Sequence, residues 1–357
     1  MQDSPIHTMT VQWAFNHVHR LEHLKFSNLI DTTPGDFLDP FIPLIPLNNL
    51  RILVLGTVSL TSIPILMSAP HLLKLRMMLE DEEIRRPTTP YRLDTISSLR
   101  SLVISTNNVD AAIIALEYLP ERNQLQSFIC YLFDRDQPPS SASAHHLFNL
   151  MKSKCNPHTF SKLELQGCIA RRQQEGVDID DYVDISALFS LSALTDVDIF
   201  LPATRVELTS EQATTIPSAW PRIEKLVLNA TRGVPMRTAC PHIDHTHLTS
   251  ILRGCPNLRV LGVRFDATQI REEQHNRSGN EEEEYVDWQC GLEKFDVGDS
   301  PILSPSPVVA FLTAHCPSLR KLECCSSDHY GTRQEFLWKT VASQVVPWKT
   351  VAPQIGL

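Results

Sequence analysis

The side chains with the clearest potential for chemistry are concentrated in one short stretch of the chain. Thiol, imidazole and carboxylate groups occur there together, at Cys240, His242, Asp244, His245, His247 and Cys255. Thiolate and imidazole are preferred ligands of zinc, so one interpretation is a metal-dependent enzyme built on the insertion between Cys240 and Cys255. The spacing, however, matches no standard zinc module. We therefore expect a polar insertion followed by a helix, with Cys255 as a small buried residue, and keep the metal site as the alternative.

Other catalytic motifs are missing from the sequence. Neither Gly-x-x-x-x-Gly-Lys-Ser/Thr nor Gly-x-Gly-x-x-Gly occurs in a chain with 12 glycines, so no phosphate-binding loop is predicted. Gly-x-Ser-x-Gly and His-Glu-x-x-His are absent as well. The 9 cysteines include no Cys-x-x-Cys pair, and we expect the adjacent Cys324 and Cys325 to serve packing. The sequence thus predicts a protein that is not an enzyme, with no catalytic residues, cofactor or metal.

Composition and charge narrow the possible partners. Apolar residues make up 42% and charged residues 20%, which is typical of a folded chain. The net charge of −9 argues against nucleic acid, because phosphate binding needs clustered Lys and Arg. No run of about 18 apolar residues exists to span a membrane, and residues 1–10 lack the pattern of a secretory signal. We expect a cytoplasmic or nuclear protein that binds neither nucleic acid nor membrane.

A repeated motif, Leu-x-x-Leu-x-Leu, organises the whole chain. It is clearest at residues 50–55, 99–104, 223–228, 258–263 and 319–324, and weaker copies begin at Leu21, Leu72, Leu125, Phe160, Leu194 and Leu292. The starts of these eleven candidate units lie 22 to 35 residues apart. Leucine-rich repeats typically have a period of about 20 to 29 residues, so the longer units are predicted to carry insertions.

The spacing within the motif predicts a fold. A short strand places the fourth residue toward the core and the third and fifth residues outward, and stacked units bury each other's apolar edges. The segments 62–69, 111–118, 248–253 and 308–313 are predicted to be short return helices, with Pro256 and Pro317 ending two of them. We therefore expect an α/β leucine-rich-repeat solenoid with a curved parallel sheet on its concave face and short helices on its convex face.

Three regions are expected along the chain. Residues 1–20 should form an incomplete repeat whose return helix, residues 11–18, leads into the first strand. Residues 21–337 should form the solenoid of about eleven irregular units. Residues 338–357 should form a C-terminal tail or loose cap, in which Trp338-Lys-Thr-Val-Ala is echoed from Trp348.

Two joints and one longer stretch carry a family resemblance. Cys-Pro-x-Leu-Arg-x-Leu occurs at residues 255–261 and 316–322, and residues 211–226 form a further typical unit. These segments resemble the leucine-rich-repeat region of fungal, basidiomycete-type F-box proteins. The resemblance implies that the repeats recognise a protein substrate, and that an F-box would dock on the adaptor of a cullin ubiquitin ligase. No F-box is found in this sequence, so the adaptor is an expected partner only if one lies upstream. A repeat-only scaffold unconnected to ubiquitin ligase is the alternative.

The third and fifth places of each motif predict the partner-binding surface on the concave face. The residues singled out there are Lys25, Lys74, Arg76, Lys162, Glu164, Asp196, Asp198, Lys225, Lys294, Asp296, Lys321 and Glu323, together with His23, Ser127, Ile129 and Val227. Tyr131 and Phe200, expected just past their strands, are possible aromatic anchors. A surface of mixed charge suits a protein with complementary charges, which steer the encounter.

Overall fold

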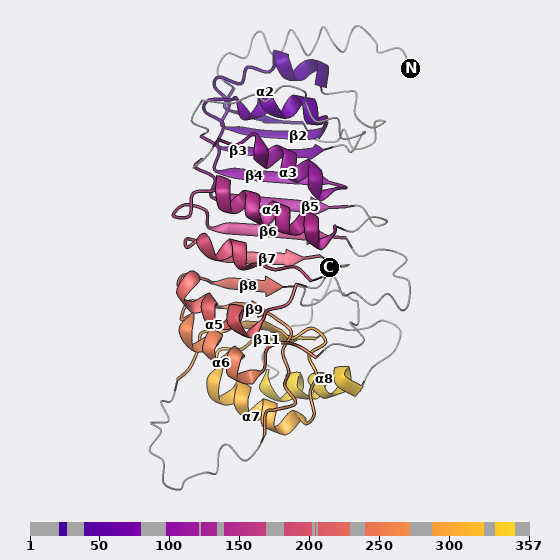
Figure 1. The fold of residues 1–357 in the computed structure, drawn as a ribbon, viewed down its shortest axis with the longest axis vertical. Helices are drawn as coiled ribbons and strands as arrows, with labels where there is room; N and C mark the ends of the chain where they lie inside the picture. Colours follow the sequence, from indigo (N-terminus) through magenta and orange to yellow (C-terminus); the bar gives the residue numbers. More distant parts are fainter. Residues whose placement is uncertain are drawn as a thin grey trace, which may run out of the picture. The chain divides into compact units, whose positions relative to one another are not determined.

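A computed structural model describes residues 21–26, 39–79, 98–120, 123–133, 139–168, 182–201, 204, 206–228, 240–271, 288–324 and 333–346 (Figure 1). The helix expected at residues 11–18 lies outside these ranges. The chain divides into two compact units, residues 1–170 and 171–357, which are described separately.

The first unit contains six strands that follow one another in chain order. They are β1 (His23–Lys25), β2 (Ile52–Val58), β3 (Lys74–Leu79), β4 (Ser101–Thr106), β5 (Ser127–Leu132) and β6 (Lys162–Gly167). Each strand pairs with the next in parallel. Parallel neighbours need a crossover between them. The helices at Val109–Glu117 and Ser141–Lys154 lie in the crossovers from β4 to β5 and from β5 to β6.

The second unit repeats the arrangement with five strands. They are β7 (Asp196–Phe200), β8 (Lys225–Leu228), β9 (Val260–Gly262), β10 (Lys294–Asp296) and β11 (Lys321–Glu323). All of them run parallel to their neighbours, again in chain order. The predicted parallel α/β architecture with one strand for each motif is therefore confirmed in both units.

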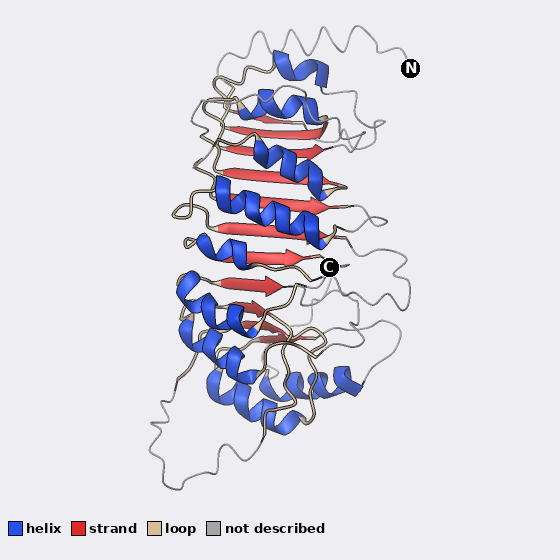
Figure 2. Ribbon diagram, in the orientation of Figure 1, coloured by secondary structure: helices blue, strands red, loops and turns tan. Residues whose placement is uncertain are grey.

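Helices cover one face of the strands in each unit (Figure 2). The first unit has η1 (Asp39–Leu44), η2 (Leu60–Ser62), α2 (Ile63–Met67), α3 (Val109–Glu117) and α4 (Ser141–Lys154). The second has η3 (Ser186–Ser190), α5 (Ser210–Ala219), α6 (His245–Gly254), α7 (Pro305–His315) and α8 (Arg333–Val345). The four return segments predicted as helices coincide with α2, α3, α6 and α7, and each is confirmed within a few residues at its ends.

A regular hydrogen-bond pattern sets the register at the start of the strands. The carbonyl of Arg51, at the second place of its motif, accepts from the backbone N–H groups of Leu73 and Lys74 at 2.8 and 2.9 Å. The carbonyl of Arg259 accepts in the same way from Glu293 and Lys294 at 2.8 and 3.0 Å. Because the same bonds recur from one motif to the next, each motif starts level with its neighbour.

This register aligns the fourth places of the motifs inside the core. Across the first unit the aligned residues are Leu53, Leu75, Leu102, Phe128 and Leu163, and all of them are buried. In the second unit Leu226, Leu261 and Phe295 align in the same way and are also buried. Burial of these rows against the helices supplies the main stabilisation of each unit.

The C-terminal end of the second unit is a packed helix. Trp338 on α8 is 1% exposed, its indole N–H donates to the Ser300 carbonyl at 2.7 Å, and its ring meets Phe265 edge-on at 6.1 Å between centroids. The boundary that we expected at residue 338 therefore falls inside α8. Residues 347–357 of the expected tail lie outside the described ranges.

Candidate protein-binding face

The predicted partner-binding residues lie on the side of the strands opposite the helices. Side chains alternate between the two faces of a strand, so the buried fourth place leaves the third and fifth places on the other side. In β3, for example, Lys74 and Arg76 are exposed while Leu75 and Met77 are buried. We call the side that carries the third and fifth places the open face of each unit.

On the first unit the open face consists of rows that cross the strands. One row contains the third places His23, Ile52, Lys74, Ser101, Ser127 and Lys162. The next row contains the fifth places Lys25, Val54, Arg76, Val103, Ile129 and Glu164. Adjacent strands lie about 4.8 Å apart, so each row brings residues from distant parts of the sequence together.

The charges of these rows are unevenly distributed. Lys25, Lys74 and Arg76 gather on β1 and β3, and all three are exposed. At the other end, Lys162 Nζ lies 3.2 Å from Glu164 Oε2, and the Tyr131 hydroxyl donates to Glu164 Oε1 at 3.4 Å. The open face of the first unit is therefore cationic on β1–β3 and neutralised on β6.

On the open face of the second unit, lysines pair with neighbouring carboxylates. Lys225 Nζ lies 2.7 Å from Asp198 Oδ2, Lys294 Nζ lies 2.6 Å from Glu323 Oε2, and Lys321 pairs with the same glutamate. Burial raises the pKa of Glu323, but the two lysines outweigh that effect and the pKa falls below its usual value. Asp196, at the third place of β7, accepts from the Thr195 hydroxyl at 2.8 Å.

Two residues predicted to be exposed are buried, and both end a strand. Asp296, the last residue of β10, is 2% exposed, and its carboxylate accepts from the backbone N–H of Gly298 at 3.1 Å. Phe200, the last residue of β7, is 7% exposed and packs with the core, so it is not available as an anchor. The alternation of faces fails at these positions because the chain is already turning out of the sheet. At Gly298 the turn requires a positive φ of 56°.

The environment of Asp296 changes its protonation. Burial raises its pKa from 3.8 to about 7, and nearby Glu323 adds to the effect, while Gly298 and the lysines oppose it. The carboxyl group is therefore partly protonated near neutral pH. Tyr131, the other proposed anchor, lies within β5 and not just past it, and its side chain is half-buried.

The His- and Cys-rich stretch between Cys240 and Cys255 contains α6 and the residues that cap its two ends. The Asp244 carboxylate caps α6 by accepting from the backbone N–H groups of Thr246 and His247, and the His247 ring lies 2.7 Å from the same oxygen. Burial raises the pKa of Asp244, but these hydrogen bonds together lower it well below its usual range. Cys255 is buried at the end of α6, whereas Cys240 is exposed. In the described ranges, no three His, Cys, Asp or Glu side chains gather as metal ligands.

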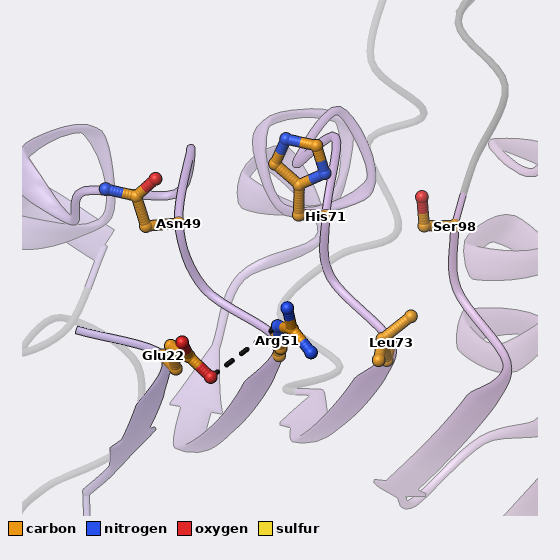
Figure 3. Close-up of a pocket in the computed structure, with 6 residues that line it drawn as sticks. All are labelled: Glu22, Asn49, Arg51, His71, Leu73 and Ser98. Atoms are coloured by element: carbon orange, nitrogen blue, oxygen red, sulfur yellow. Dashed lines mark ion pairs between the residues drawn. The ribbon is translucent and has the colours of Figure 1, made fainter. Parts of the chain in front are cut away.

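A polar groove lies in the first unit where the strands begin (Figure 3). Its volume is about 510 Å³, and it is lined by Glu22, Asn49, Arg51, His71, Leu73 and Ser98. Arg51 Nε pairs with Glu22 Oε2 at 3.6 Å, and the Ser98 hydroxyl donates to the Pro70 carbonyl at 2.6 Å. The serine is thus bonded to the backbone and not to His71, so the groove shows no activated nucleophile.

Two polar side chains with several partners, one buried and one half-buried, were not anticipated from the sequence. Arg264 lies between Glu207 and Asp299, with nitrogen–oxygen distances of 3.0 and 2.8 Å, and its side chain is 12% exposed. Gln212 on α5 donates to Asp184 at 2.6 Å and to Ser186 at 3.1 Å, and accepts from Tyr182 at 3.0 Å. Neither residue belongs to a motif place, so the repeat pattern could not single them out. Both connect segments around the core of the second unit.

Comparison with known proteins adds no functional assignment. No protein-family model matches the chain, and no curated protein matches it. Among the helices in the described ranges, none is both long and apolar enough to cross a membrane.

Proposed function

We propose that this chain is a protein-binding scaffold of the leucine-rich-repeat type, which holds its partner on the open face. The observation that carries the proposal is the alignment of the third and fifth places into continuous rows of charged, polar and apolar side chains. Parallel strands, one for each motif, with helices on the other side support the repeat class.

The chemistry of the open face suits protein recognition better than catalysis. Its apolar members, such as Val54, Val103 and Ile129, are only half-buried and can lose the rest of their exposure to a partner. Lysine and arginine beside them would steer an oppositely charged surface into place. In the described ranges we find no arrangement of nucleophile, base and orienting group on this face.

Photo-crosslinking from single positions tests the location of binding. A photoreactive phenylalanine at Val103 or Ile129 should give specific protein adducts in extracts of the source organism. The same residue at Lys152, exposed on α4 on the helix side, is the matched control. Equal adducts from all three positions, or adducts from Lys152 alone, would contradict binding on the open face.

The resemblance to F-box proteins extends the proposal to a substrate receptor of a cullin ubiquitin ligase. Co-purification of the cullin adaptor with the full-length gene product is the test. Stoichiometric adaptor supports the receptor, and repeated absence favours the repeat-only scaffold. The proposed compartment is the cytoplasm or nucleus, which agrees with the eight cysteines of the described ranges all being free thiols.

A further inference from the structure

Among the described residues, the cations on β1–β3 of the first unit have no carboxylate partner. Lys25, Lys74 and Arg76 are exposed, and in the part of the chain that the structure describes no carboxylate lies within ion-pair distance of them. Lys25 and Arg76 sit in one row on either side of Val54, and Lys74 lies two residues before Arg76. Three positive groups thus share a small area on one face of the sheet.

The second unit provides an internal comparison. Its open face also carries three lysines, but each of them pairs with Asp198 or Glu323. A folded protein with a net charge of −9 has enough carboxylates to neutralise its lysines. The three cations on β1–β3 equal these lysines in number. They differ in that no described carboxylate pairs with them.

Apolar side chains continue the same row beyond Arg76. Val103 on β4 and Ile129 on β5 follow it in register, and both are half-buried. Tyr131, two residues after Ile129, flanks them on the next row of β5. The row therefore passes from cationic to apolar over a few strands.

We propose that this row, together with Lys74 of the neighbouring row, binds an acidic peptide segment of a partner protein, with carboxylates over Lys25, Lys74 and Arg76 and an apolar side chain over Val103 and Ile129. The inference rests on the proposed function, because it names the partner chemistry for the same open face. Charge complementarity selects carboxylates, and the apolar end of the row selects a peptide over a free anion.

Strand spacing predicts the pattern of the bound segment. Lys25 and Arg76 lie two strands apart, or about 10 Å, and Ile129 lies about 10 Å further along the row. An extended peptide advances about 3.3 Å per residue, so about three residues separate successive contacts. The expected segment has two acidic residues about three positions apart, followed or preceded at similar spacing by an apolar residue.

Selection from a displayed library of random peptides on the immobilised full-length chain tests this inference. Enriched peptides should be acidic and contain an apolar residue at the predicted spacing. Their affinity is then measured by fluorescence polarisation against a variant with Lys25→Gln, Lys74→Gln and Arg76→Gln. The matched control carries Lys152→Gln, Arg222→Gln and Arg253→Gln, which removes the same charge from exposed positions elsewhere.

The expected result is a dissociation constant raised about tenfold or more by the β1–β3 variant, and changed less than about twofold by the control. Binding should also weaken as salt rises from about 0.05 to about 0.5 M, because exposed charges are screened. Thermal melting of both variants checks that they remain folded.

Other outcomes separate the inference from the proposed function. Enrichment of neutral or basic peptides, of acidic peptides that bind both variants equally, or of no peptide at all would overturn the inference. The scaffold function would still stand if Val103→Asp or Ile129→Asp abolished binding of whichever peptides were enriched. It would also stand if the photo-crosslinks from the open face persisted. If neither held, both proposals would fail.

Discussion

Asp296 is buried, although its place in the motif predicts an exposed side chain. It stands at the fifth place of β10, beside Glu323 on β11, yet its carboxyl group is buried and bonded to the turn at Gly298. A charged carboxylate is disfavoured there because burial removes it from water. The protonated form is stabilised instead, and the pKa rises to about 7.

This shift predicts a pH-dependent stability. Between the usual pKa of 3.8 and about 7, the folded state holds a proton at Asp296 that the unfolded state has lost. The free energy of unfolding should therefore fall as pH rises through this window, by up to roughly 4 kcal/mol from this group. Asp296→Asn should remove that contribution. Urea unfolding of both proteins at several pH values between 4 and 8.5 measures it.

The variant should gain stability relative to the wild type as pH rises, because the amide has no charge to bury. A constant difference between the two proteins across this range would show that Asp296 titrates in the ordinary way. The other titrating groups are common to both proteins, so the difference isolates this residue.

The motif predicts the exposure or burial of many single side chains correctly, but not of all. The exposure of Lys25, Lys74 and Arg76 and the burial of Leu75 follow from the alternation of faces along a strand. Asp296 and Phe200 do not follow it, although Lys25 also ends its strand and is exposed. The repeat pattern carries no information on where the chain turns out of the sheet. The burial of Arg264 and Gln212 depends on the insertions around them, which differ from unit to unit.

At the scale of elements, the contact between α5 and α6 depends on a glycine. A methyl group at Gly254, the last residue of α6, would lie 2.5 Å from Cβ and 2.6 Å from Cγ of Pro217 on α5. Such distances require one helix to shift, because the proline side chain is closed in a ring onto its own backbone nitrogen and cannot rotate away.

Gly254→Ala is therefore expected to lower the free energy of unfolding by about 1 to 3 kcal/mol. Gly291→Ala is the matched control, since no atom lies within 4 Å of the added methyl group. Chemical denaturation followed by circular dichroism measures both. Equal stability of the two variants would show that α5 and α6 do not approach each other as closely as described.

The last helix offers a second test at this scale. Trp338 is buried against Phe265 and bonded to Ser300, whereas Phe336 on the same helix is 70% exposed. Trp338→Ala should lower the free energy of unfolding by about 3 to 5 kcal/mol, and Phe336→Ala should change it by less than about 0.5 kcal/mol.

Thermal and chemical unfolding of these two variants decides whether α8 belongs to the folded unit. If Trp338→Ala were as stable as Phe336→Ala, residue 338 would belong to a tail or loose cap, the two alternatives that the sequence offered. The sequence missed this helix because its apolar residues follow no motif place, although Trp338 is a large apolar residue that needs burial.

The element order itself was predictable for a physical reason. Each motif has an apolar fourth place that must be covered, and parallel stacking in chain order covers all of them with the shortest connections. Strand lengths were not predictable, and they range from three residues in β9 to seven in β2. They depend on how soon each chain segment turns toward its helix.

At the scale of the molecule, stacking of the motifs creates rows of side chains that no single motif has. A strand such as β4 presents only Ser101 and Val103 on the open face, but its register with β3 and β5 joins them to Arg76 and Ile129. The proposed partner recognition would therefore be a property of rows across strands. The sequence predicted which residues belong to the face, and the register adds which charges remain unpaired on it.

Covalent footprinting of the native lysines tests the central claim that the open face holds the partner. The purified full-length chain, alone and in complex with its most abundant co-purifying protein, is acetylated briefly, and modification of each lysine is quantified by mass spectrometry. Lys25 and Lys74 report on the open face of the first unit, and Lys152 reports on the helix side. We expect the partner to slow acetylation of Lys25 and Lys74 several-fold and to leave Lys152 unchanged. Protection of Lys152, with Lys25 and Lys74 reacting as freely as in the isolated chain, would contradict the account.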